Sequence, residues 1–398
     1  MSAIGDPHAA IGALAPELVA LRRQLHQQPE LGFQEWQTAA LVEERLGRLG
    51  LARVRRVTPT GVVGELEGGR PGPTLLLRAD LDALPIQERS GAPYASRVDG
   101  VHHACGHDGH TAILLGVARA LAERAAALAG RVLLVFQPAE ELPPGGAAAM
   151  LEAGLLEGPR PDAALALHLI TDLPLGTIGV SDGAFMAGND WFSVTLRGRG
   201  GHGAMPHQAV DAIAIAGQVL VALQTVVSRH LSPLESGVVT VGTLRGGTIS
   251  NVIADEVRLD GTLRYLEPGI RDLLREQVTA IPRGIAAALG GEAEVEIRPF
   301  CPPVVNDPQL AALVRAAAAE VVGSERVVSG RRTMGGDDMG FILERVPGCY
   351  FWVGAAHPAR GPARPHHHPS FDFDEEALAI GAETLLRASL RVLERGVA

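Results

Sequence analysis

The sequence predicts an α/β protein with a mostly parallel sheet and helices on both faces, interrupted by a smaller α+β domain. Short apolar runs alternate with helical patterns on both sides of the middle of the chain, which is typical of strand–helix–strand units in a parallel sheet. In the middle, apolar and polar residues alternate as in half-buried strands. We therefore predict one discontinuous domain of residues 1–186 and 300–398, and an inserted domain of residues 187–299.

Composition supports two globular domains and narrows the class of partner. The chain has 398 residues, of which 46% are hydrophobic, enough for a full core. Its formal net charge of −10 argues against a nucleic-acid or anionic-membrane partner, which would favour a basic surface. Three cysteines do not make a disulfide framework, and we see neither a signal peptide nor an apolar run long enough to span a membrane. We expect a cytoplasmic protein.

The elements of the first domain follow from apolar periodicity. Leucines at helical spacing predict helices within residues 9–49, broken by Pro29 and Gly32. Helices are also expected at residues 111–128 and 146–154. The apolar runs that predict strands are Gly61–Leu66, Thr74–Arg78, Val132–Phe136 and Ala163–Leu167.

The inserted domain has the element order βαββαβ, which is typical of a ferredoxin-like fold. Its expected elements are Asn189–Leu196, Ala209–Arg229, Val238–Gly242, Val257–Leu263, Gly269–Leu289 and Ala293–Arg298. The chain then returns to the first domain. There we expect a helix at Pro308–Val322, a buried strand at Cys349–Val353 and a closing helix at Glu375–Glu394.

Residues that can ligate a metal follow three of the apolar runs. Asp82 comes after the second run, Glu140 and Glu141 after the third, and His168 after the fourth. Because sites in open α/β sheets form at the carboxyl ends of the strands, these side chains are expected at one edge. A cluster of histidines, His366, His367 and His368, follows the strand predicted at Cys349–Val353.

The run from His102 to His110 carries four histidines, one cysteine and one aspartate. Cys105 and His107 lie one residue apart, and Gly106 allows the bend that would aim both at one point. The run precedes a predicted helix, whose free N–H groups favour a thiolate. A histidine-rich surface loop is the alternative, but other ligand-type residues punctuate the chain in the same way.

Thiolate, imidazole and carboxylate together suit zinc, and also manganese, cobalt or nickel. A structural zinc site would be rich in cysteine and local in sequence, whereas these candidates are dispersed over more than half of the chain. Such an assembly can hold two metals ~3.5–4 Å apart. Of the adjacent pair, one glutamate can ligate metal while the other takes a proton from metal-bound water. The alternative is that Glu140 and Glu141 are surface residues that begin a loop.

Six stretches resemble the signature sequences of the di-metal aminoacylase and carboxypeptidase family. The similarity extends from Leu21 to Phe373 and is closest to the amidohydrolase subgroup, which includes hippurate hydrolases and indole-acetyl-amino-acid hydrolases. The resemblance implies a di-zinc exopeptidase-like fold with an inserted lid and dimerisation domain. The stretches are Arg22–Gly32, Arg78–Pro85, His103–His110, Phe136–Glu141, Arg199–His207 and His367–Phe371.

The resemblance also implies roles for individual residues of the first domain. Glu140 matches the general base, and Asp82 matches an aspartate that orients a metal ligand. Asp80 stands where other branches of the family place a metal-binding histidine, so its role stays open, and His103 and His110 are expected to support the ligands. The implied ligands of two divalent ions per subunit are Cys105, His107, Glu141, His168 and His367.

In the inserted domain, the resemblance points to a glycine-rich turn and to two positions beyond it. His202 matches a residue that reaches the partner subunit's site and polarises the scissile carbonyl. Asn251 and Arg264 match positions that hold the substrate carboxylate, and an arginine suits that task because it can form two parallel hydrogen bonds. His207, in the same turn as His202, is a further candidate for substrate binding. A homodimer, or a dimer of dimers, is implied.

We therefore expect a metal-dependent amidohydrolase that cleaves the N-acyl bond of a small-molecule N-acyl-amino acid. A dipeptidase or carboxypeptidase is the enzymatic alternative, because a dipeptide is also an acylated amino acid. A non-catalytic metal-binding or ligand-binding relative is the alternative from another class. The presence of Glu140 argues against the latter. The acyl group, the amino acid and the native metal stay open.

Overall fold

The computed structural model describes residues 5–356 and 364–396, which form two compact units. The first unit comprises Met1–Phe185, Val304–Arg332 and Asp338–Ala398. The second comprises Met186–Pro303 and Thr333–Asp337. The second unit thus ends four residues later than the boundary expected at 299, and it also takes in a short piece of the C-terminal segment.

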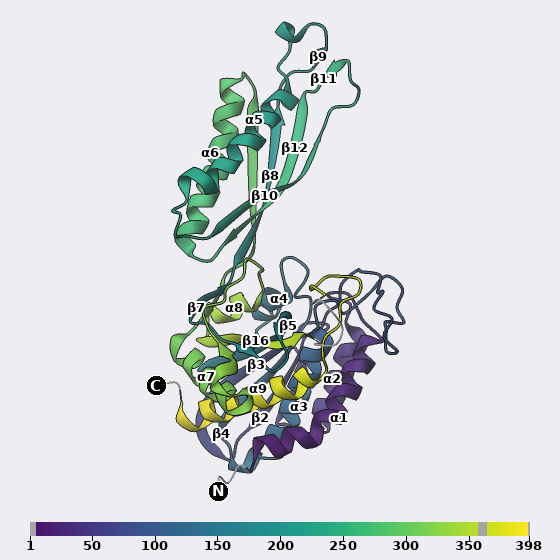
Figure 1. Ribbon diagram of the computed structural model, residues 1–398, viewed down its shortest axis with the longest axis vertical. Helices are drawn as coiled ribbons and strands as arrows, with labels where there is room; N and C mark the ends of the chain where they lie inside the picture. The colour runs from purple at the N-terminus through teal and green to yellow at the C-terminus, as the bar shows by residue number, and fades with distance from the viewer. Residues whose placement is uncertain (1–4, 357–363, 397–398) are drawn as a thin grey trace. The chain divides into compact units, whose positions relative to one another are not determined.

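The first unit is built on a mixed, mostly parallel sheet of eight strands (Figure 1). The strands β3, β4, β5 and β16 run parallel to their neighbours in the middle, whereas β1 and β2 add an antiparallel edge. The predicted sheet is therefore confirmed. In sheet order the strands are β1 Arg53–Arg56, β2 Val62–Glu67, β4 Ala129–Gln137, β3 Arg70–Asp80, β5 Ala163–Pro174, β16 Gly348–Ala356, β6 Ile178–Gly179 and β15 Val327–Val328.

Helices cover the central strands. The helices α1, α3 and α9 pack against one another, α7 packs against α9, and α3 and α9 lie against β3 and β5. Figure 1 shows α4 and α8 on the other side of the central strands from α9. The helices of this unit are α1 Pro7–His26, α2 Trp36–Gly47, α3 His107–Ala122, α4 Gly146–Glu152, α7 Pro308–Val322, α8 Met339–Leu343 and α9 Glu376–Arg395, and a short pair of strands, β7 Gly183–Met186 and β14 Val304–Asn306, completes it.

The residues of the first helix explain where it begins and which of its sides is buried. Asp6 caps α1 by accepting a hydrogen bond from the backbone N–H of His8, and Pro7 occupies the first turn. One stripe of the helix is buried in the core, at Ile11, Leu14, Leu18, Leu21 and Leu25. The helix ends at His26, before the proline and glycine that were expected to break it.

Two elements near the candidate ligands differ from the prediction. The strand β5 continues through His168 to Pro174, so His168 lies within the strand and pairs with Trp352 of β16. The helix α3 begins at His107 rather than at residue 111, directly after Gly106 with φ 88°. Both differences place ligand-type residues on regular structure, where the sheet and the helix hold them more firmly than a loop would.

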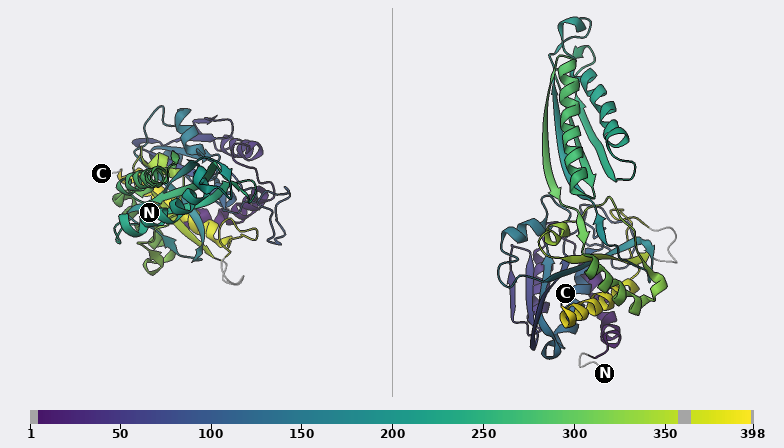
Figure 2. Two further views of the ribbon diagram at one scale, coloured as in Figure 1. Left: turned by 90° about the horizontal axis from the view of Figure 1, so that it is seen from above. Right: turned by 90° about the vertical axis from the view of Figure 1, so that its left-hand side faces the viewer.

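The second unit confirms the predicted βαββαβ order. Its four strands form an antiparallel sheet in the order β10 Gly237–Gly246, β12 Glu256–Tyr265, β8 Gly188–Arg197 and β13 Glu292–Cys301. Two helices, α5 Ala212–Thr225 and α6 Pro268–Ala288, pack on one face of this sheet, as the right-hand view of Figure 2 shows. A separate strand pair, β9 Gly201–His202 and β11 Val252–Ile253, carries the glycine-rich turn.

One helical stretch departs from the expectation that no segment is apolar enough to span a membrane. By length and composition alone, the helical stretch Ala212–His230 is long and apolar enough to cross a membrane. The stretch consists of α5 and a following π-helical turn at Val226–His230, and only part of it is buried. Ile215, Val219 and Leu223 pack into the core of the second unit, which is the ordinary reason for an apolar stripe on a helix.

Candidate metal centre

The first unit brings the dispersed ligand candidates together. The ends of β3 and β4 lead to Asp82 and to Glu140 and Glu141, and β5 carries His168. Cys105 and His107 stand at the start of α3, and His367 follows β16. Ligand atoms of Cys105, His107 and His168 lie within 4.8 Å of one another, and so do those of Cys105, Glu141 and His367.

Individual distances show one continuous cluster. The Sγ atom of Cys105 lies 3.5 Å from Nε2 of His168. Nε2 of His367 lies 3.0 Å from Oε1 of Glu141. A third group of ligand atoms within 4.8 Å of one another joins His107 to Glu140 and Glu141. Cys105 and Glu141 are thus common to neighbouring groups, as two adjacent metal positions would require.

The histidine tautomers fit a metal. Nδ1 of His107 donates to the backbone oxygen of Asp82 at 3.0 Å, and Nδ1 of His168 donates to the backbone oxygen of Leu169 at 2.6 Å. In both rings the unprotonated nitrogen is then Nε2, the atom that faces the cluster. Nε2 of His107 is buried and has no hydrogen-bond partner among the described residues. A ligating histidine ordinarily donates its other N–H in this way, so the residues present fit the implied cations.

The carboxylates of the cluster also favour a bound cation. Burial and the carboxylates of Glu141 and Glu140 raise the pKa of the Cys105 thiol well above its ordinary value. Burial alone would lower the pKa of His107, but Asp80 and Asp82 raise it to about 10. A divalent ion would reverse both effects, because metal ligation needs a thiolate and a neutral imidazole.

Asp82 forms hydrogen bonds with three residues of the cluster. Its Oδ1 and Oδ2 atoms accept hydrogen bonds from the backbone N–H groups of Glu140 and Glu141, each at 3.0 Å. Its backbone oxygen holds the ring of His107. One residue therefore contacts the two glutamates and a histidine, as expected of the orienting role that the resemblance implies.

A second buried carboxylate, Glu35, supports the same turn and was missed by the sequence analysis. Its Oε1 accepts a hydrogen bond from the backbone N–H of Ala139 at 2.8 Å. Ala139 has φ 48°, a conformation that is strained for any residue other than glycine. This strain directly precedes Glu140, so the turn holds the glutamate pair in place at a local conformational cost.

Asp80, whose role the sequence left open, belongs to a buried polar network. Its Oδ1 lies 2.6 Å from Nδ1 of His110, and its Oδ2 accepts from Arg78 at 2.7 Å. Arg78 also donates to Asp338 at 2.9 Å. Asp338 lies 260 positions beyond Arg78, so spacing in the sequence could not predict that the two residues pair. His110 completes the link, since its Nε2 accepts from the backbone N–H of Leu169 at 3.0 Å.

The three adjacent histidines separate clearly. His367 has φ 65° and reaches Glu141. The ring nitrogens of His366 are buried, and its ring lies against Phe371, with centroids 4.8 Å apart. His368 points elsewhere, and its Nδ1 accepts from the backbone N–H of Ser370. The positive φ at His367 turns its side chain toward Glu141, whereas His366 stays beside the cluster, with its ring centroid 5.2 Å from that of His168.

Comparison with known proteins identifies the family. The model of peptidase family M20/M25/M40 matches residues 76–391, well over half of the chain. The chain belongs to this family. Within the family it belongs to the amidohydrolase subgroup. It is similar to an N-acetylcysteine deacetylase of Bacillus subtilis, with 40% identity over 96% of this chain and 98% of that protein.

Two further relatives of this M20 protein bear on its site. An IAA-amino acid hydrolase of Arabidopsis thaliana is 39% identical over 94% of this chain and 84% of that protein. A solved structure described as a dinuclear metal binding peptidase from the M20 family, from Bacillus subtilis, is 37% identical. The match covers 96% of this chain and 99% of the chain in that structure, with a TM-score of 0.84. The chain therefore has the M20 fold, including both units.

The second unit of this M20 protein carries the remaining candidates. His202 lies on β9 and is exposed, and Gly203 N–H donates to the backbone oxygen of Asn251 at 2.9 Å, so His202 and Asn251 are close. His207 is exposed in a short 3₁₀ turn at Pro206–Gln208. Arg264 lies apart from that turn, on β12, where it pairs with Asn189 of β8. The roles of these four residues stay predictions.

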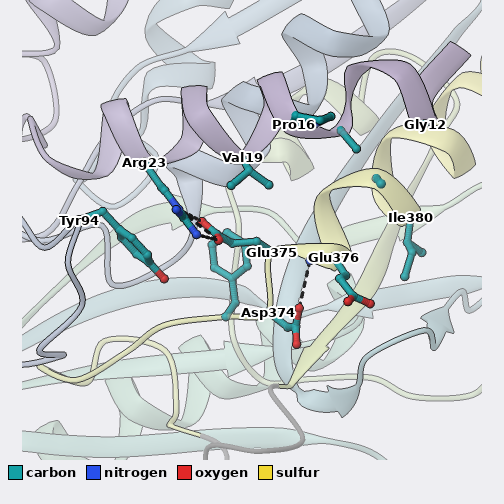
Figure 3. A pocket seen from close by; sticks show the side chains of 12 residues that line it. Gly12, Pro16, Val19, Arg23, Tyr94, Asp374, Glu375, Glu376 and Ile380 are labelled. Atoms are coloured by element: carbon teal, nitrogen blue, oxygen red, sulfur yellow. Dashed lines mark hydrogen bonds and ion pairs between the residues drawn. The ribbon is translucent and has the colours of Figure 1, made fainter.

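A large open cavity of the first unit lies away from the metal cluster. It has a volume of about 950 Å³ and lies between α1 and the start of α9 (Figure 3). Arg23 and Glu375 pair at its wall, with Tyr94 beside them. None of the candidate ligands lines this cavity. Its size alone is therefore no argument for the catalytic site, because the acid–base and metal-binding groups are elsewhere.

Proposed function

We propose that this chain hydrolyses the amide bond of N-acyl-amino acids, releasing a carboxylic acid and a free amino acid. The observation that carries the proposal is the glutamate pair held against the Cys105, His107 and His168 group. The N-acetylcysteine deacetylase and the IAA-amino acid hydrolase support it, because the names of both describe acylated or conjugated amino acids.

Cys105, His107, Glu141, His168 and His367 are the residues that would hold two divalent ions. When bound, zinc, manganese, cobalt or nickel would supply Lewis acidity to the scissile carbonyl and lower the pKa of water. The mixed donor set suits these metals better than calcium or magnesium, which favour oxygen ligands.

Glu140 is the proposed general base. It is nine-tenths buried, and the contact of its backbone N–H with Asp82 fixes its position. A glutamate that accepts the proton of the attacking water can return the same proton to the leaving amine. Such proton transfer contributes typically ~10²–10⁴-fold to the rate. Asp82 acts through position, since it contacts the backbone of both glutamates.

Arg264 is the proposed anchor for the substrate carboxylate. Burial lowers the pKa of its guanidinium, and the neighbouring Cys301 side chain opposes this effect. A partly buried arginine is stabilised when an anion pairs with it. Asn251 and His207 are proposed to contact the substrate, and His202 to polarise the scissile carbonyl from the partner subunit.

We further propose that the second unit forms a homodimer. The strand β10 is an edge strand of its sheet, with one side open to pairing. On α5, Val221 and Ile213 are exposed although large and apolar, at 69% and 47%. An exposed apolar helix beside an open strand edge fits association of two copies, because a two-fold contact repeats each interaction.

A substrate panel tests the function. Hippurate, several N-acetyl-amino acids and dipeptides would be incubated with enzyme reconstituted in turn with zinc, manganese and cobalt, and free amino acid would be measured. We expect N-acyl-amino acids to be cleaved in preference to dipeptides, and chelation to abolish turnover. Faster cleavage of dipeptides would support a dipeptidase or carboxypeptidase. No cleavage of any substrate by metal-loaded protein would contradict the proposal.

A further inference from the structure

A second group of metal-ligating side chains lies in the first unit, separate from the proposed catalytic cluster. Ligand atoms of His26, Glu88 and His102 lie within 4.8 Å of one another. His26 is the last residue of α1, and the other two belong to the long connection between β3 and α3. All three side chains are at least 97% buried, with exposures of 1%, 3% and 0%.

Two distances within this group are close to those between ligands of one metal. Nε2 of His26 lies 3.4 Å from Oε1 of Glu88, and Nε2 of His102 lies 3.8 Å from the same oxygen. Zinc bonds nitrogen and carboxylate oxygen at ~2.0–2.2 Å, which in a tetrahedral site places two ligands roughly 3.3–3.5 Å apart. The ligand atoms of His26 and His102 also lie within 4.8 Å of each other, so small side-chain shifts would bring all three atoms to one cation.

A second carboxylate sets the tautomer of His26. Its Nδ1 lies 2.7 Å from Oδ2 of Asp108, and Arg22 donates to the same oxygen at 2.8 Å. The buried guanidinium of Arg22 pairs with the Asp108 carboxylate, which therefore accepts from Nδ1 of His26, so Nδ1 carries the proton. Nε2 then faces Glu88. A carboxylate on one ring nitrogen and a metal on the other is the usual setting of a ligating histidine.

His102 supplies an independent observation. Neither of its ring nitrogens has a hydrogen-bond partner among the described residues, although the residue is completely buried. Burial of an unpartnered polar group is ordinarily destabilising. Burial also lowers the pKa of His102 to about 4, which keeps the ring neutral and able to ligate. Burial opposes ionisation of Glu88, but the hydrogen bonds that its carboxylate accepts, among them those from Ser90 and the backbone of Ser96, lower its pKa to about 2, so it is charged under the same conditions.

We propose that His26, Glu88 and His102 bind a third divalent cation of the zinc type, distinct from the two of the catalytic cluster. The cation would join the end of α1 to the connection that leads into Cys105 and His107. Its function would be structural, because the three ligands are buried and no proton-transfer group of the catalytic cluster is among them. The rival explanation is a protonated His26 that bridges Asp108 and Glu88 without a metal.

The experiment compares metal content per subunit by elemental analysis after zinc loading and gel filtration. Wild type would be measured beside His102→Met and Glu88→Gln, which keep approximate side-chain volume. His230→Gln, an exposed histidine of the second unit, is the matched control. We expect His102→Met and Glu88→Gln each to bind one zinc fewer than wild type and His230→Gln to bind the same amount. Equal metal content in all four proteins would overturn the proposal.

Two further measurements keep the result decisive. Cys105→Ala should lose zinc from the catalytic cluster and retain the equivalent that His102→Met loses, so the two sites are read separately. If the His102 or Glu88 variants fail to fold, an anomalous difference map of zinc-loaded wild-type crystals replaces them. A peak within ~2.5 Å of Nε2 of His26 and Oε1 of Glu88 is expected. Peaks confined to the Cys105 cluster would overturn the proposal and leave the proposed hydrolase intact.

Discussion

The adjacent glutamates follow a strained turn and have different surroundings. Ala139 adopts φ 48°, and the next two N–H groups both donate to Asp82. Glu141 then faces His367, at 3.0 Å. This contact supports the proposal that Glu141 is the metal ligand and Glu140 the base.

Substitution of each glutamate tests that division. Glu140→Gln should retain both metals and lose kcat by ~10²-fold or more, because an amide cannot accept the proton. Glu141→Gln should instead reduce metal content, since it removes a charged ligand. Steady-state kinetics and elemental analysis on the same preparations distinguish the two. An exchange of the two phenotypes would mean that base and ligand are assigned the wrong way round.

Asp108 gives a prediction for acid stability. Its pKa in the folded protein is depressed by Arg22 and His26 against the effect of burial, below the ordinary value of 3.8. The ionised form is thus favoured in the folded state, and its contribution to stability is present above pH 3.8 and lost as the pH falls further. Urea unfolding between pH 6 and pH 2.5 should show a gap between wild type and Asp108→Asn that narrows below pH 4. A gap that stays constant would contradict the assignment.

At the scale of elements, α1 is held by a buried arginine as well as by its apolar stripe. Arg22 has no exposed side-chain area and pairs with Asp108 and Asp372 at 2.8 and 3.0 Å. Its guanidinium carbon also lies 4.2 Å from the centre of the Phe373 ring. Segments far apart in sequence, the first helix and the approach to the last, are thus joined through one side chain.

Substitution of Arg22 should lower the free energy of unfolding far more than substitution of a surface arginine. Arg22→Met removes the arginine that pairs with two buried carboxylates. Removal of one partner of a buried ion pair usually lowers the free energy of unfolding by ~3–5 kcal/mol. Arg45→Met is the matched control, because Arg45 pairs with Glu17 on the surface and such pairs contribute ~0–1 kcal/mol. Chemical unfolding at pH 7 measures both. Similar losses for the two variants would show that Arg22 is not a principal anchor of α1.

Local sequence patterns located most elements but not the ends that matter for the site. The apolar run at Ala163–Leu167 predicted a strand that in fact continues to Pro174, because polar His168 and Thr171 are also buried there. The helix after the Cys105 run begins earlier than its apolar periodicity suggested, since His107, Asp108 and His110 are buried through contacts with other segments. A polar residue in a core interrupts the pattern from which strand and helix ends are predicted.

At the scale of the whole molecule, the proposal that His202 serves the partner subunit can be tested by mixing two inactive variants. His202→Ala should lose ~10²–10³ in kcat as an oxyanion donor, and Glu140→Gln should be similarly impaired. In a mixed dimer one site would carry both defects and the other neither. With random assortment half of the dimers are mixed, so about a quarter of wild-type activity should return.

The control for this experiment is a demonstration that subunits exchange, for example by mass-tagged copies of the two variants. If exchange is shown and activity stays at the level of the parents, His202 acts within its own subunit and the shared site is ruled out.

The sequence by itself determined the α/β class, the inserted βαββαβ domain and the set of residues able to ligate metal. These depend on local periodicity and on residue chemistry, which a single chain displays directly. Only the tertiary structure decided that Asp82 holds Glu140 and Glu141, that Arg78 pairs with Asp338, and that His26, Glu88 and His102 meet. Such contacts join segments tens to hundreds of residues apart, and they form only when a closed core brings those segments together and removes water from their polar groups.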